Sequence, residues 1–543
     1  MTNIKYDEII IGAGAAGCVV AAHIAENTEL SIALLEAGPI DSDPFIHIPA
    51  GYANILAHDR HVWKYETTPQ HGIRKSLRQA KVLGGGSSIN AMCYVRGRPI
   101  DYDKWQTAVG ETGAWSFEDI LPHFVAQENN DTFHNKYHGT GGGLAVQLPH
   151  GINELNQRCL KAFQEFRLEY NPDYKGEKQV GVSPVQSTVG DCRRCSAADA
   201  YLKKHLASGR VTLLSETEVT KIILKDGRAI GVEISSHNKH NTVFGAEIIL
   251  SGGAIHSPRL LMLSGIGPKA HLEELGIDVV LDSPDVGENF HDHAVVPLKV
   301  HVEGQLGYQA AAHGLETLKA GLRYLTTKDG RAAGNGVETV SYFDPENLAS
   351  DEATIQCYHV PIISSDGLTP TGSQSGLTFE LVVLRPRNRG TVRLADADPK
   401  SMPLIDPNYF GDDDDLRIAI KAVEAVRDVI KQQSLVSIIT DEVEPGPEIQ
   451  SADQIGEWIK NISTTMWHPV GTCRMDEDSR AVVDARLRVK GINGLRVIDA
   501  SIMPNITSGN TNAPTQALAR HGATLFVEDL FAKVSSRVSE PVA

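Results

Sequence analysis

Cysteine is scarce in this chain, and disulfide bonds are not expected to hold it together. The 543 residues include 7 cysteines, an odd number, whereas disulfide frameworks are typical of short chains that are dense in cysteine. Cys192 and Cys195 form a C-x-x-C pair, which could be a redox dithiol or half of a zinc site. Because no second pair supplies the other zinc ligands, we interpret this segment as an ordinary connection and leave a redox role open.

Long hydrophobic runs are missing as well. The longest uncharged apolar stretch near the N-terminus, residues 9–22, contains three glycines. It is shorter than the roughly 20 residues that cross a bilayer. Asp7 and Glu8 stand before it, where a secretory signal would carry basic residues. The sequence therefore predicts no integral membrane segment and a cytoplasmic location.

Basic residues are outnumbered by acidic ones. The chain has 51 Lys and Arg against 68 Asp and Glu, a formal net charge of −17. Such a surface repels the phosphates of nucleic acids, so nucleic acid is not expected as a partner and a neutral or cationic small molecule is easier to accommodate. With 41% hydrophobic and 22% charged residues, the composition is that of a globular protein long enough for two domains.

The first 38 residues have the pattern of a strand, a helix and a second strand. Residues 6–11 are rich in strand formers, residues 15–25 are rich in helix formers, and residues 30–35 are apolar again. The turn after the first strand carries the motif G-x-G-x-x-G, formed by Gly12, Gly14 and Gly17. Such a loop presents backbone amides to a pyrophosphate, and Glu36 at the end of the second strand can accept hydrogen bonds from a ribose. The unit predicts dinucleotide binding but does not distinguish NAD from FAD.

Further signals follow along the chain. Residues 211–253 predict a second α/β stretch with a hairpin at residues 225–227. Residues 495–498 predict a strand that precedes a helix beginning near Pro514. A second glycine-rich loop, residues 81–91, would suit a backbone wrapped around a flat cofactor, or equally a flexible surface loop.

Several long motifs occur in a characteristic order. They are residues 81–91, 253–267, 286–289 with Asp292 and His293, 468–475, 497–501 and 509–515. Through these motifs the chain resembles the glucose-methanol-choline (GMC) oxidoreductases over nearly its whole length, and within them the bacterial branch of choline and alcohol dehydrogenase-like proteins.

The resemblance implies an α/β fold in two parts. A doubly wound, Rossmann-like FAD-binding domain, discontinuous in sequence, would combine residues 1–148, 191–298 and 466–543. A second, α+β substrate-binding domain, built on an antiparallel sheet, would combine residues 149–190 and 299–465.

The cofactor implied by the resemblance is FAD. The ADP half would contact Gly12, Gly14, Ala15, Ala16, Gly17, Glu36 and Ala37, with Val219 beside the adenine. The remaining contacts would be Val82, Gly85, Asn90, Ala91, Met92, Trp467, Asp499, Ala500 and Asn512. Some members attach the flavin covalently to a histidine in the glycine-rich loop, but Ile89 stands at that position. We therefore expect non-covalent FAD.

The implied reaction is oxidation of an alcohol to an aldehyde or ketone by hydride transfer to flavin N5, with oxygen or a quinone-like compound as electron acceptor. His468 matches the family's base, and a histidine pKa near neutrality suits that role. Asn510 matches the second active-site position and can bond the substrate oxygen without taking its proton. Alternatives are a lyase that keeps FAD without its redox chemistry, an NAD-dependent dehydrogenase and a non-catalytic flavin-binding protein.

Substrate identity and oligomeric state stay open, and no metal is predicted. His291-Asp292-His293 resembles a ligand cluster, but the family has a similar sequence there without a metal. Residues 412–415 are all aspartate, as favoured at the N-terminus of a helix. Glu338 could face a cationic substrate group, although glutamate at this place also occurs in relatives that act on uncharged alcohols.

Acid precipitation of the purified protein should release intact FAD into the supernatant, because Ile89 offers no nucleophile for a covalent bond. The measurement is the flavin absorbance of the supernatant and of the redissolved pellet. Flavin that stays with the pellet would contradict the prediction.

Overall fold

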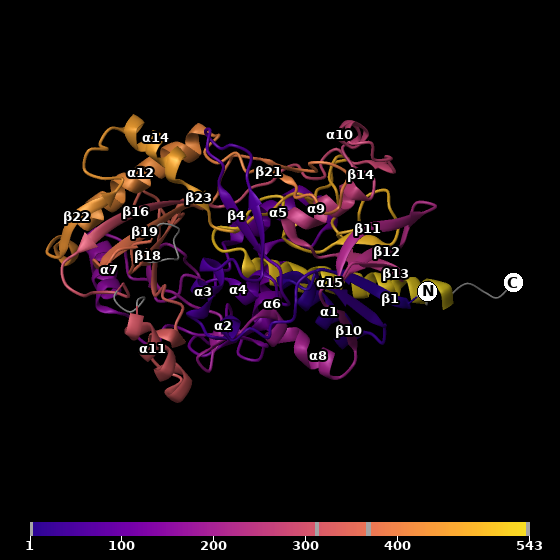
Figure 1. Cartoon of the computed structure of the whole chain (residues 1–543), viewed down its shortest axis with the longest axis horizontal. Helices are drawn as coiled ribbons and strands as arrows, with labels where there is room; N and C mark the ends of the chain where they lie inside the picture. The colour runs from indigo at the N-terminus through magenta and orange to yellow at the C-terminus, as the bar shows by residue number, and fades with distance from the viewer. Residues whose placement is uncertain (1–3, 310–313, 365–370, 539–543) are drawn as a thin grey trace.

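Two seven-stranded sheets organise this computed structural model, which describes residues 4–309, 314–364 and 371–538 (Figure 1). The first sheet has the order β10-β2-β1-β13-β12-β11, and β24 pairs with β13. Its strands are β1 Ile4–Ile11, β2 Ile32–Leu35, β10 Val211–Leu214, β11 Glu218–Lys225, β12 Arg228–Ser236, β13 Lys239–Leu250 and β24 Leu495–Val497. The strands β10, β2, β1, β13 and β24 run parallel, whereas β11 and β12 form an antiparallel extension.

Parallel pairing buries both faces of this sheet. Residues 32–35 of β2 are fully buried, as expected for a central strand covered by helices on both sides. Helix α1, Ala15–Asn27, packs along α15, Asn512–Val538, and α15 also contacts α6, Phe117–Gln127. The predicted strand, helix and strand of the first 38 residues are therefore present, and the hairpin predicted at residues 225–227 joins β11 to β12.

The second sheet is antiparallel throughout. Its order is β22-β16-β19-β18-β17-β7, with β23 paired to β16. Its strands are β7 Gly181–Pro184, β16 Ala294–Val302, β17 Thr339–Phe343, β18 Ile355–Val360, β19 Gly376–Val383, β22 Ile439–Glu444 and β23 Thr464–Thr465. The predicted fold class, a doubly wound sheet joined to a domain on an antiparallel sheet, is confirmed.

The two faces of the second sheet pack against different parts of the chain. One face forms a core with α7, Glu154–Glu165, α12, Asp413–Ile430, and α14, Ala452–Ile462. The other face turns toward the first sheet and packs against residues such as Cys93 and Val95. Strand β16 of the second sheet begins at Ala294, before residue 299, where the substrate domain was predicted to resume.

Local sequence explains where several of these helices begin. The Asp412 side chain accepts a hydrogen bond from the Asp414 backbone, and three further aspartates fill the first turn of α12. The acidic run is therefore a helix N-terminus. Ser451 and Gln454 form a capping box at the start of α14, and Ser116 and Asp119 form another at the start of α6.

The remaining helices and strands connect the elements described above. Those within residues 44–282 are α2 Pro44–His47, α3 Gly51–Ala57, β3 Val62–Glu66, β4 Ser76–Ala80, α4 Gly86–Ile89, α5 Pro99–Val109, β5 Glu128–Asn130, β6 Leu144–Val146, β8 Val189–Gly190, β9 Arg193–Arg194, α8 Lys203–Ala207, α9 Gly253–Leu263, β14 Ile266–Gly267, α10 Lys269–Glu274 and β15 Leu281–Asp282. The others are α11 Gly314–Thr327, which projects from the body in Figure 1, β20 Thr391–Arg393, β21 Leu404–Asp406 and α13 Gln433–Val436.

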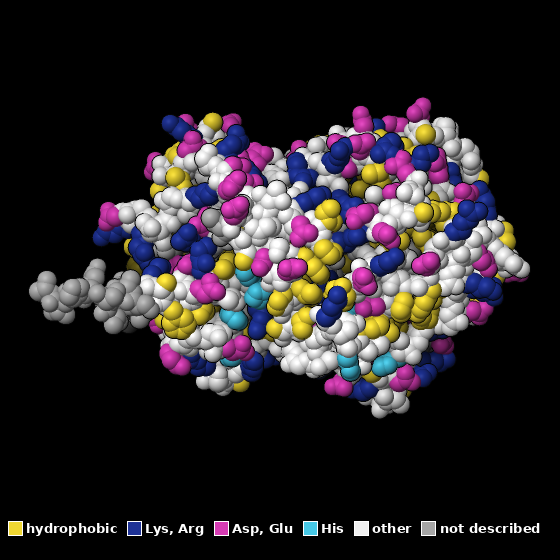
Figure 2. All heavy atoms as spheres, turned by 180° about the vertical axis from the view of Figure 1, so that it is seen from behind, with side chains coloured by type: hydrophobic (Ala, Val, Ile, Leu, Met, Phe, Trp, Pro, Cys, Tyr) yellow, Lys and Arg dark blue, Asp and Glu magenta, His cyan; other side chains and the backbone are white. Residues whose placement is uncertain are grey.

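The outer surface carries charges of both signs. Figure 2 shows acidic and basic side chains interspersed over one face, with hydrophobic side chains gathered in patches between them. Among the described residues, no helix is both long enough and apolar enough to cross a membrane.

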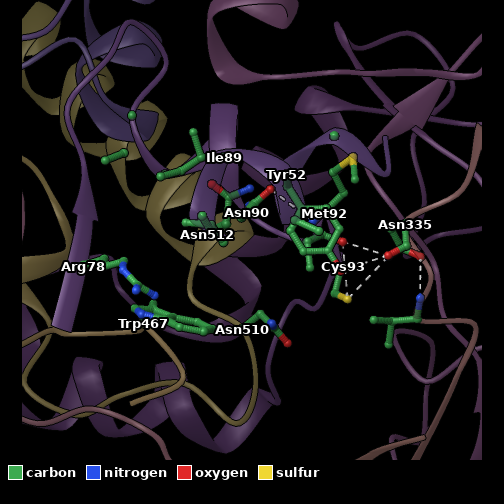
Figure 3. A pocket seen from close by; sticks show the side chains of 18 of the residues that line it. Tyr52, Arg78, Ile89, Asn90, Met92, Cys93, Asn335, Trp467, Asn510 and Asn512 are labelled. Carbon is green, nitrogen blue, oxygen red and sulfur yellow. Dashed lines mark hydrogen bonds between the residues drawn. The ribbon is translucent and has the colours of Figure 1, made fainter. Parts of the chain in front are cut away.

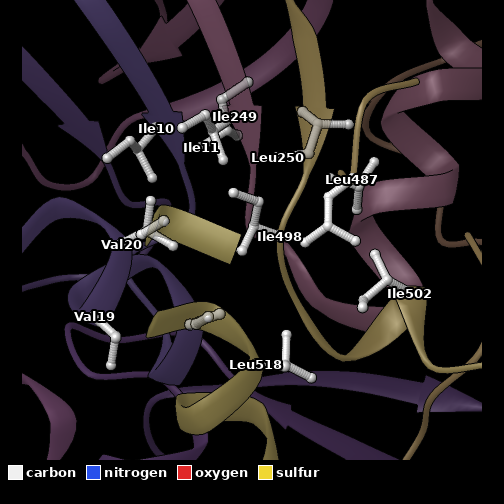
Figure 4. Close-up of a cluster of buried hydrophobic side chains, with 14 of the residues drawn as sticks. Ile10, Ile11, Val19, Val20, Ile249, Leu250, Leu487, Ile498, Ile502 and Leu518 are labelled. Carbon is white, nitrogen blue, oxygen red and sulfur yellow. The ribbon is translucent and has the colours of Figure 1, made fainter. Parts of the chain in front are cut away.

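The C-terminal segment completes the core of the first sheet. Ile498 follows β24, donates its backbone N–H to the Leu250 carbonyl at 2.8 Å, and is fully buried among side chains of the sheet and of α15 (Figure 4). Helix α15 approaches so closely here that a Cβ on Gly522 would lie 2.9 Å from the Ile498 side chain. The contact leaves no space for a larger residue on the helix.

Ile498→Ala should lower the free energy of unfolding by about 2 to 5 kcal/mol, because the substitution opens a cavity that close packing prevents from collapsing. Ile73→Ala serves as the control, since Ile73 is 42% exposed, and should change that free energy by no more than about 0.5 kcal/mol. Urea unfolding followed by circular dichroism at fixed cofactor concentration measures both. Equal effects of the two substitutions would contradict the packing described for Ile498.

Candidate active site

A cavity of about 980 Å³ lies between the two sheets. The glycine-rich turn after β1, the loop at residues 85–93 and residues 466–469 line it from one side. Tyr358 of β18 and Glu380 of β19 line it from the second sheet. A neighbouring cavity of about 120 Å³ shares Gly14 and Gly85 with it and extends to Glu36 and Val219. Together the two cavities give an extended site at the carboxyl ends of the parallel strands, where open α/β sheets bind ligands.

The turn after β1 is built by glycines that no other residue could replace. Gly12 has φ +98°, and a Cβ there would lie 2.5 Å from the Ser251 carbonyl oxygen. A Cβ on Gly17 would lie 1.8 Å from the Gly12 carbonyl oxygen. Helix α1 begins directly after Gly14, and no side chain caps its N-terminus. Its first backbone N–H groups therefore remain available for an anion such as a pyrophosphate.

The two glycine-rich loops touch each other through their backbones. Gly85 has φ +55°, and a Cβ there would lie 2.6 Å from the Gly14 Cα. Gly84 donates its backbone N–H to the Ala13 carbonyl at 2.8 Å. The second loop is therefore a fixed wall of the cavity, and the flexible-loop interpretation does not hold.

Glu36 sits in the smaller cavity with room for a further partner. Its Oε2 accepts a hydrogen bond from the Ala13 backbone at 2.9 Å, and its Oε1 accepts one from the Gly38 backbone at 2.8 Å. Each carboxylate oxygen can accept a second bond, so both can still receive a hydroxyl. Burial raises the pKa of Glu36 to about 7, and the two backbone bonds oppose that shift.

Arg194 fixes the second glycine-rich loop and was not singled out in the sequence. The side chain is 1% exposed. Its guanidinium donates to Asn90 Oδ1 and to the Asn90 carbonyl, each at 2.7 Å, and to the Ser87 carbonyl at 3.0 Å. The only signal available in the sequence was its place between Cys192 and Cys195, which drew attention to the thiols instead.

The Asp499 carboxylate joins the loop after β24 to the start of α9. It accepts hydrogen bonds from the Gly253 backbone at 2.8 Å, from the Ser257 hydroxyl, and from the backbone and hydroxyl of Ser501. Asp499 and Ala500 line the large cavity, so this network holds the loop that borders it. Burial raises the pKa of Asp499.

Two histidines form a hydrogen-bonded pair whose proton positions the structure determines. His293 Nε2 lies 3.0 Å from the Leu384 carbonyl oxygen, and His293 Nδ1 lies 3.0 Å from His468 Nδ1. A carbonyl can only accept, so a neutral His293 carries its proton on Nε2 and accepts at Nδ1. His468 must then carry its proton on Nδ1, which leaves Nε2 unprotonated on the side of Asn510.

Burial keeps His468 neutral. The side chain lies within the wall of the cavity, and its residue is 9% exposed. Desolvation, and to a smaller extent the neighbouring His293, hold the pKa of His468 well below the usual histidine value. A neutral imidazole with an unprotonated Nε2 is the protonation state of a general base.

Asn510 is oriented by the second sheet. Its Oδ1 accepts hydrogen bonds from the Tyr358 hydroxyl at 2.6 Å and from Gln356 Nε2 at 3.3 Å. The amide Nδ2 must therefore point the other way, and it lies 3.3 Å from His468 Nε2. In Figure 3, Asn510 and Trp467 lie on one side of the cavity, and Ile89, Asn90 and Asn512 lie on the other.

Asp292 holds the backbone that carries His468. Its Oδ1 accepts the His468 N–H at 2.8 Å, and its Oδ2 accepts the hydroxyls of Tyr409 and Thr465. Thr465 in turn accepts the N–H of Trp467, whose φ of +58° is unusual for a bulky side chain. Burial raises the pKa of Asp292 to about 6, against the hydrogen bonds that favour its ionised form.

Most of the predicted site residues meet at the two cavities. The large cavity is lined by Gly14, Ala15, Ala16, Gly85, Asn90, Ala91, Met92, Trp467, His468, Asp499, Ala500, Asn510 and Asn512, and the small one by Gly12, Gly14, Glu36, Ala37, Gly85 and Val219. Val82 and Gly17 line neither: Val82 is fully buried beneath the loop with Ile89, and Gly17 packs on Gly12. His293 and Tyr358 were not predicted as site residues, because their positions follow from contacts between distant segments.

The other candidate clusters have protein partners. His291 bonds the Asn289 carbonyl at 2.6 Å and the Ile506 N–H at 2.9 Å through its two ring nitrogens. Among the described residues, Asp41, His47 and Asp199 have the geometry of a metal site, but Lys203 Nζ already bonds both carboxylates, at 2.7 and 2.6 Å.

The C-x-x-C pair does not form a disulfide. Cys192 and Cys195 are both free thiols. Cys195 contacts the Ala145 N–H at 3.4 Å, whereas Cys192 lies 3.8 Å from His150 Nε2. The two side chains therefore have different partners.

Comparisons with known proteins identify relatives along nearly the whole chain. Two family models described as GMC oxidoreductase match residues 6–295 and 386–519. An alcohol dehydrogenase (acceptor) of Pseudomonas putida is 37% identical over 532 residues, which cover 96% of this chain and 96% of that protein. An oxygen-dependent choline dehydrogenase of Brucella anthropi is 37% identical over 521 residues, 94% of each chain.

A solved structure agrees with these matches. Pyridoxine 4-oxidase of Mesorbium loti superposes with a TM-score of 0.87 at 29% identity, covering 96% of this chain and 99% of that one. The resemblance inferred from the motifs is confirmed, and with it the expectation of an oxidoreductase that acts on CH–OH donors. GMC oxidoreductases bind FAD, and the glycine cradle, the uncapped start of α1 and the spare acceptor capacity of Glu36 fit an extended dinucleotide.

Gly85→Ala should weaken FAD binding at least about 10-fold, a change of about 1.4 kcal/mol, because a Cβ forces the two glycine loops apart at Gly14. Gly86→Ala is the matched control, since a Cβ on Gly86 has no neighbour within 4 Å. The measurement is titration of flavin-free protein with FAD, followed by protein fluorescence. Unchanged affinity in Gly85→Ala would show that the loops do not need this contact.

Proposed function

The chain belongs to the GMC oxidoreductases, FAD-dependent enzymes that act on CH–OH donors, and we propose that it oxidises an alcohol to an aldehyde or ketone with His468 as the base. The observation that carries the proposal is the neutral imidazole whose unprotonated Nε2 faces the Asn510 amide in the cavity wall. An alcohol oxygen bound between these two side chains would be within reach of both.

The cofactor site follows from the two cavities. Residues of the β1 turn with Glu36 would hold the ADP half, Val219 would lie by the adenine, and residues 85–92 with Asp499 and Ala500 would border the flavin. Bound FAD supplies a two-electron acceptor for the hydride that leaves the carbinol carbon. Because Ile89 has no nucleophilic atom, we infer non-covalent binding.

The proton of the alcohol passes to His468 Nε2. Protonation makes His468 an imidazolium whose Nδ1–H still donates to His293 Nδ1, so the ring keeps its orientation throughout. Asn510 orients the substrate oxygen through its Nδ2, and Tyr358 and Gln356 prevent the amide from turning over. Helix α15 begins at Asn512 on the cavity wall. The positive end of its dipole would there stabilise the negative charge of a reduced flavin.

Electrons would leave to oxygen or to a quinone-like acceptor. The relatives include an acceptor-dependent alcohol dehydrogenase and oxygen-dependent choline dehydrogenases, which supports either acceptor. The family assignment removes the NAD-dependent alternative. The alternatives of a lyase and of a non-catalytic flavin-binding protein both predict a flavin that an alcohol does not bleach under anaerobic conditions.

His468→Ala should slow anaerobic flavin reduction by roughly 100-fold or more at saturating alcohol, because the base is lost while FAD contacts remain. Asn510→Ala should slow the reaction less, since this side chain positions the substrate and carries no proton. Stopped-flow absorbance of the flavin measures both variants. If His468→Ala reduces its flavin at the parental rate, the base lies elsewhere.

The pH profile of the same rate constant gives an independent check. Burial lowers the pKa of His468, so the imidazole is already neutral at pH 6.5 and above. The rate should therefore stay level above the ordinary histidine range and fall only at more acidic pH, where His468 becomes protonated.

A further inference from the structure

Glu380 places a carboxylate in the cavity wall that the mechanism above does not use. The residue lies on β19 between Pro297 of β16 and Tyr358 of β18. Its neighbours Phe379 and Leu381 belong to the core on the outer face of the sheet. Because side chains alternate along a strand, Glu380 points to the opposite face, where it lines the large cavity.

This carboxylate lacks a partner among the residues that the structure describes. No hydrogen bond or ion pair of the described chain involves the Glu380 side chain. Lys299, on the neighbouring strand, forms its ion pair with Glu444 at 2.9 Å instead. Glu338, the glutamate that the sequence suggested for a cationic group, does not line the cavity, and its oxygens accept bonds from Asn153 and Tyr308.

Glu380 lies close to the proposed reaction site. Cross-strand neighbours such as Glu380 and Tyr358 have Cβ atoms about 4.5 to 5.5 Å apart. The Tyr358 hydroxyl reaches Asn510 at 2.6 Å, and Asn510 lies beside His468 Nε2. The carboxylate is thus separated from the reacting hydroxyl by about the length of one tyrosine side chain, a distance that a small substrate can bridge.

The surroundings of Glu380 are aromatic and apolar. Tyr52 and Tyr358 line the same cavity, together with Val360, Ile362 and Met466. Tyr308 lines it as well, but the Arg331 guanidinium already lies over its ring, 5.3 Å from the centroid. Aromatic faces attract cations, and such rings are the usual surroundings of quaternary ammonium groups in binding sites. One carboxylate among aromatic rings is a poor site for an anion and a good one for a cation.

We propose that Glu380 is a specificity residue of this cavity and pairs with a cationic nitrogen that the alcohol carries a few bonds from its hydroxyl. The proposal rests on the proposed alcohol oxidation, because it assumes that the hydroxyl binds at His468 and Asn510. An ionised carboxylate without a partner in a desolvated cavity is costly, and a bound cation supplies the missing partner.

The charged and titratable groups around Glu380 are few. Lys299 faces it from β16, Tyr358 from β18, Tyr52 from α3 and Cys93 from the second glycine-rich loop. Burial raises the pKa of Glu380 to about 7, and Lys299 opposes the shift. The fraction of ionised Glu380, and with it the attraction for a cation, should therefore increase as the pH rises from 6 to 8.

The test compares alcohols that differ only in charge. Choline and 3-(trimethylammonio)propan-1-ol are each paired with the carbon isostere, 3,3-dimethylbutan-1-ol and 4,4-dimethylpentan-1-ol. Anaerobic flavin reduction in the FAD-loaded enzyme gives the half-saturating concentration of each alcohol. We expect at least one cation to bind about 10-fold or more tightly than its isostere, and Glu380→Gln to abolish that difference.

Glu338→Gln is the matched control, because it removes a buried carboxylate that does not line the cavity; the preference for the cation should persist in it. Calorimetric titration with tetramethylammonium, which has no hydroxyl, tests the subsite without turnover, and binding should be lost in Glu380→Gln. A cation preference that survives in Glu380→Gln, or tetramethylammonium binding that does not depend on Glu380, would overturn the proposal. If tetramethylammonium binding depends on Glu380 but no alcohol reduces the flavin, the subsite stands and the alcohol oxidation fails.

Discussion

The hydrogen bond from His293 to the Leu384 carbonyl determines the chemistry of the whole cavity. Because a carbonyl cannot donate, this single contact fixes the tautomer of His293 and then that of His468, so that the unprotonated nitrogen of His468 is the one that faces Asn510. Leu384 directly follows β19, so the second sheet decides which nitrogen of a residue near the first sheet can accept a proton. The protonation state of His468 therefore depends on the contact between the two parts of the chain, and it cannot be predicted from any one segment alone.

The two sheets contribute different physical properties to the cavity. The parallel sheet supplies backbone: turns at Gly12 and Gly85 that approach each other because they lack side chains, and an uncapped helix end. The antiparallel sheet supplies side chains, since Tyr358 and Glu380 project from its cavity face at positions set by strand register. A cofactor that all members of a family share can be held by backbone groups, which every residue provides. A substrate that differs between members is recognised by side chains, which substitutions can exchange.

The sequence predicted the parts of this arrangement that depend on local pattern. The strand, helix and strand of the first 38 residues follow from periodicity and glycine spacing, and the structure has them at Ile4–Ile11, Ala15–Asn27 and Ile32–Leu35. The resemblance to a family supplied His468 and Asn510, but it could not supply the proton positions. Arg194 and Glu380 escaped notice because their roles arise from contacts with segments far away in sequence, such as Arg194 with Asn90.

Burial shifts the pKa values of His468 and Glu380, two titratable groups of the cavity, in opposite directions, and the two shifts complement each other. Desolvation disfavours charge, so it lowers the pKa of His468 and raises that of Glu380. The base is therefore neutral at the pH where the carboxyl group begins to ionise. A cationic alcohol would supply its own charge to the carboxylate and leave the imidazole free to take the hydroxyl proton. Rate and affinity then depend on pH through different residues, so mutation of one residue should leave the pH dependence caused by the other intact.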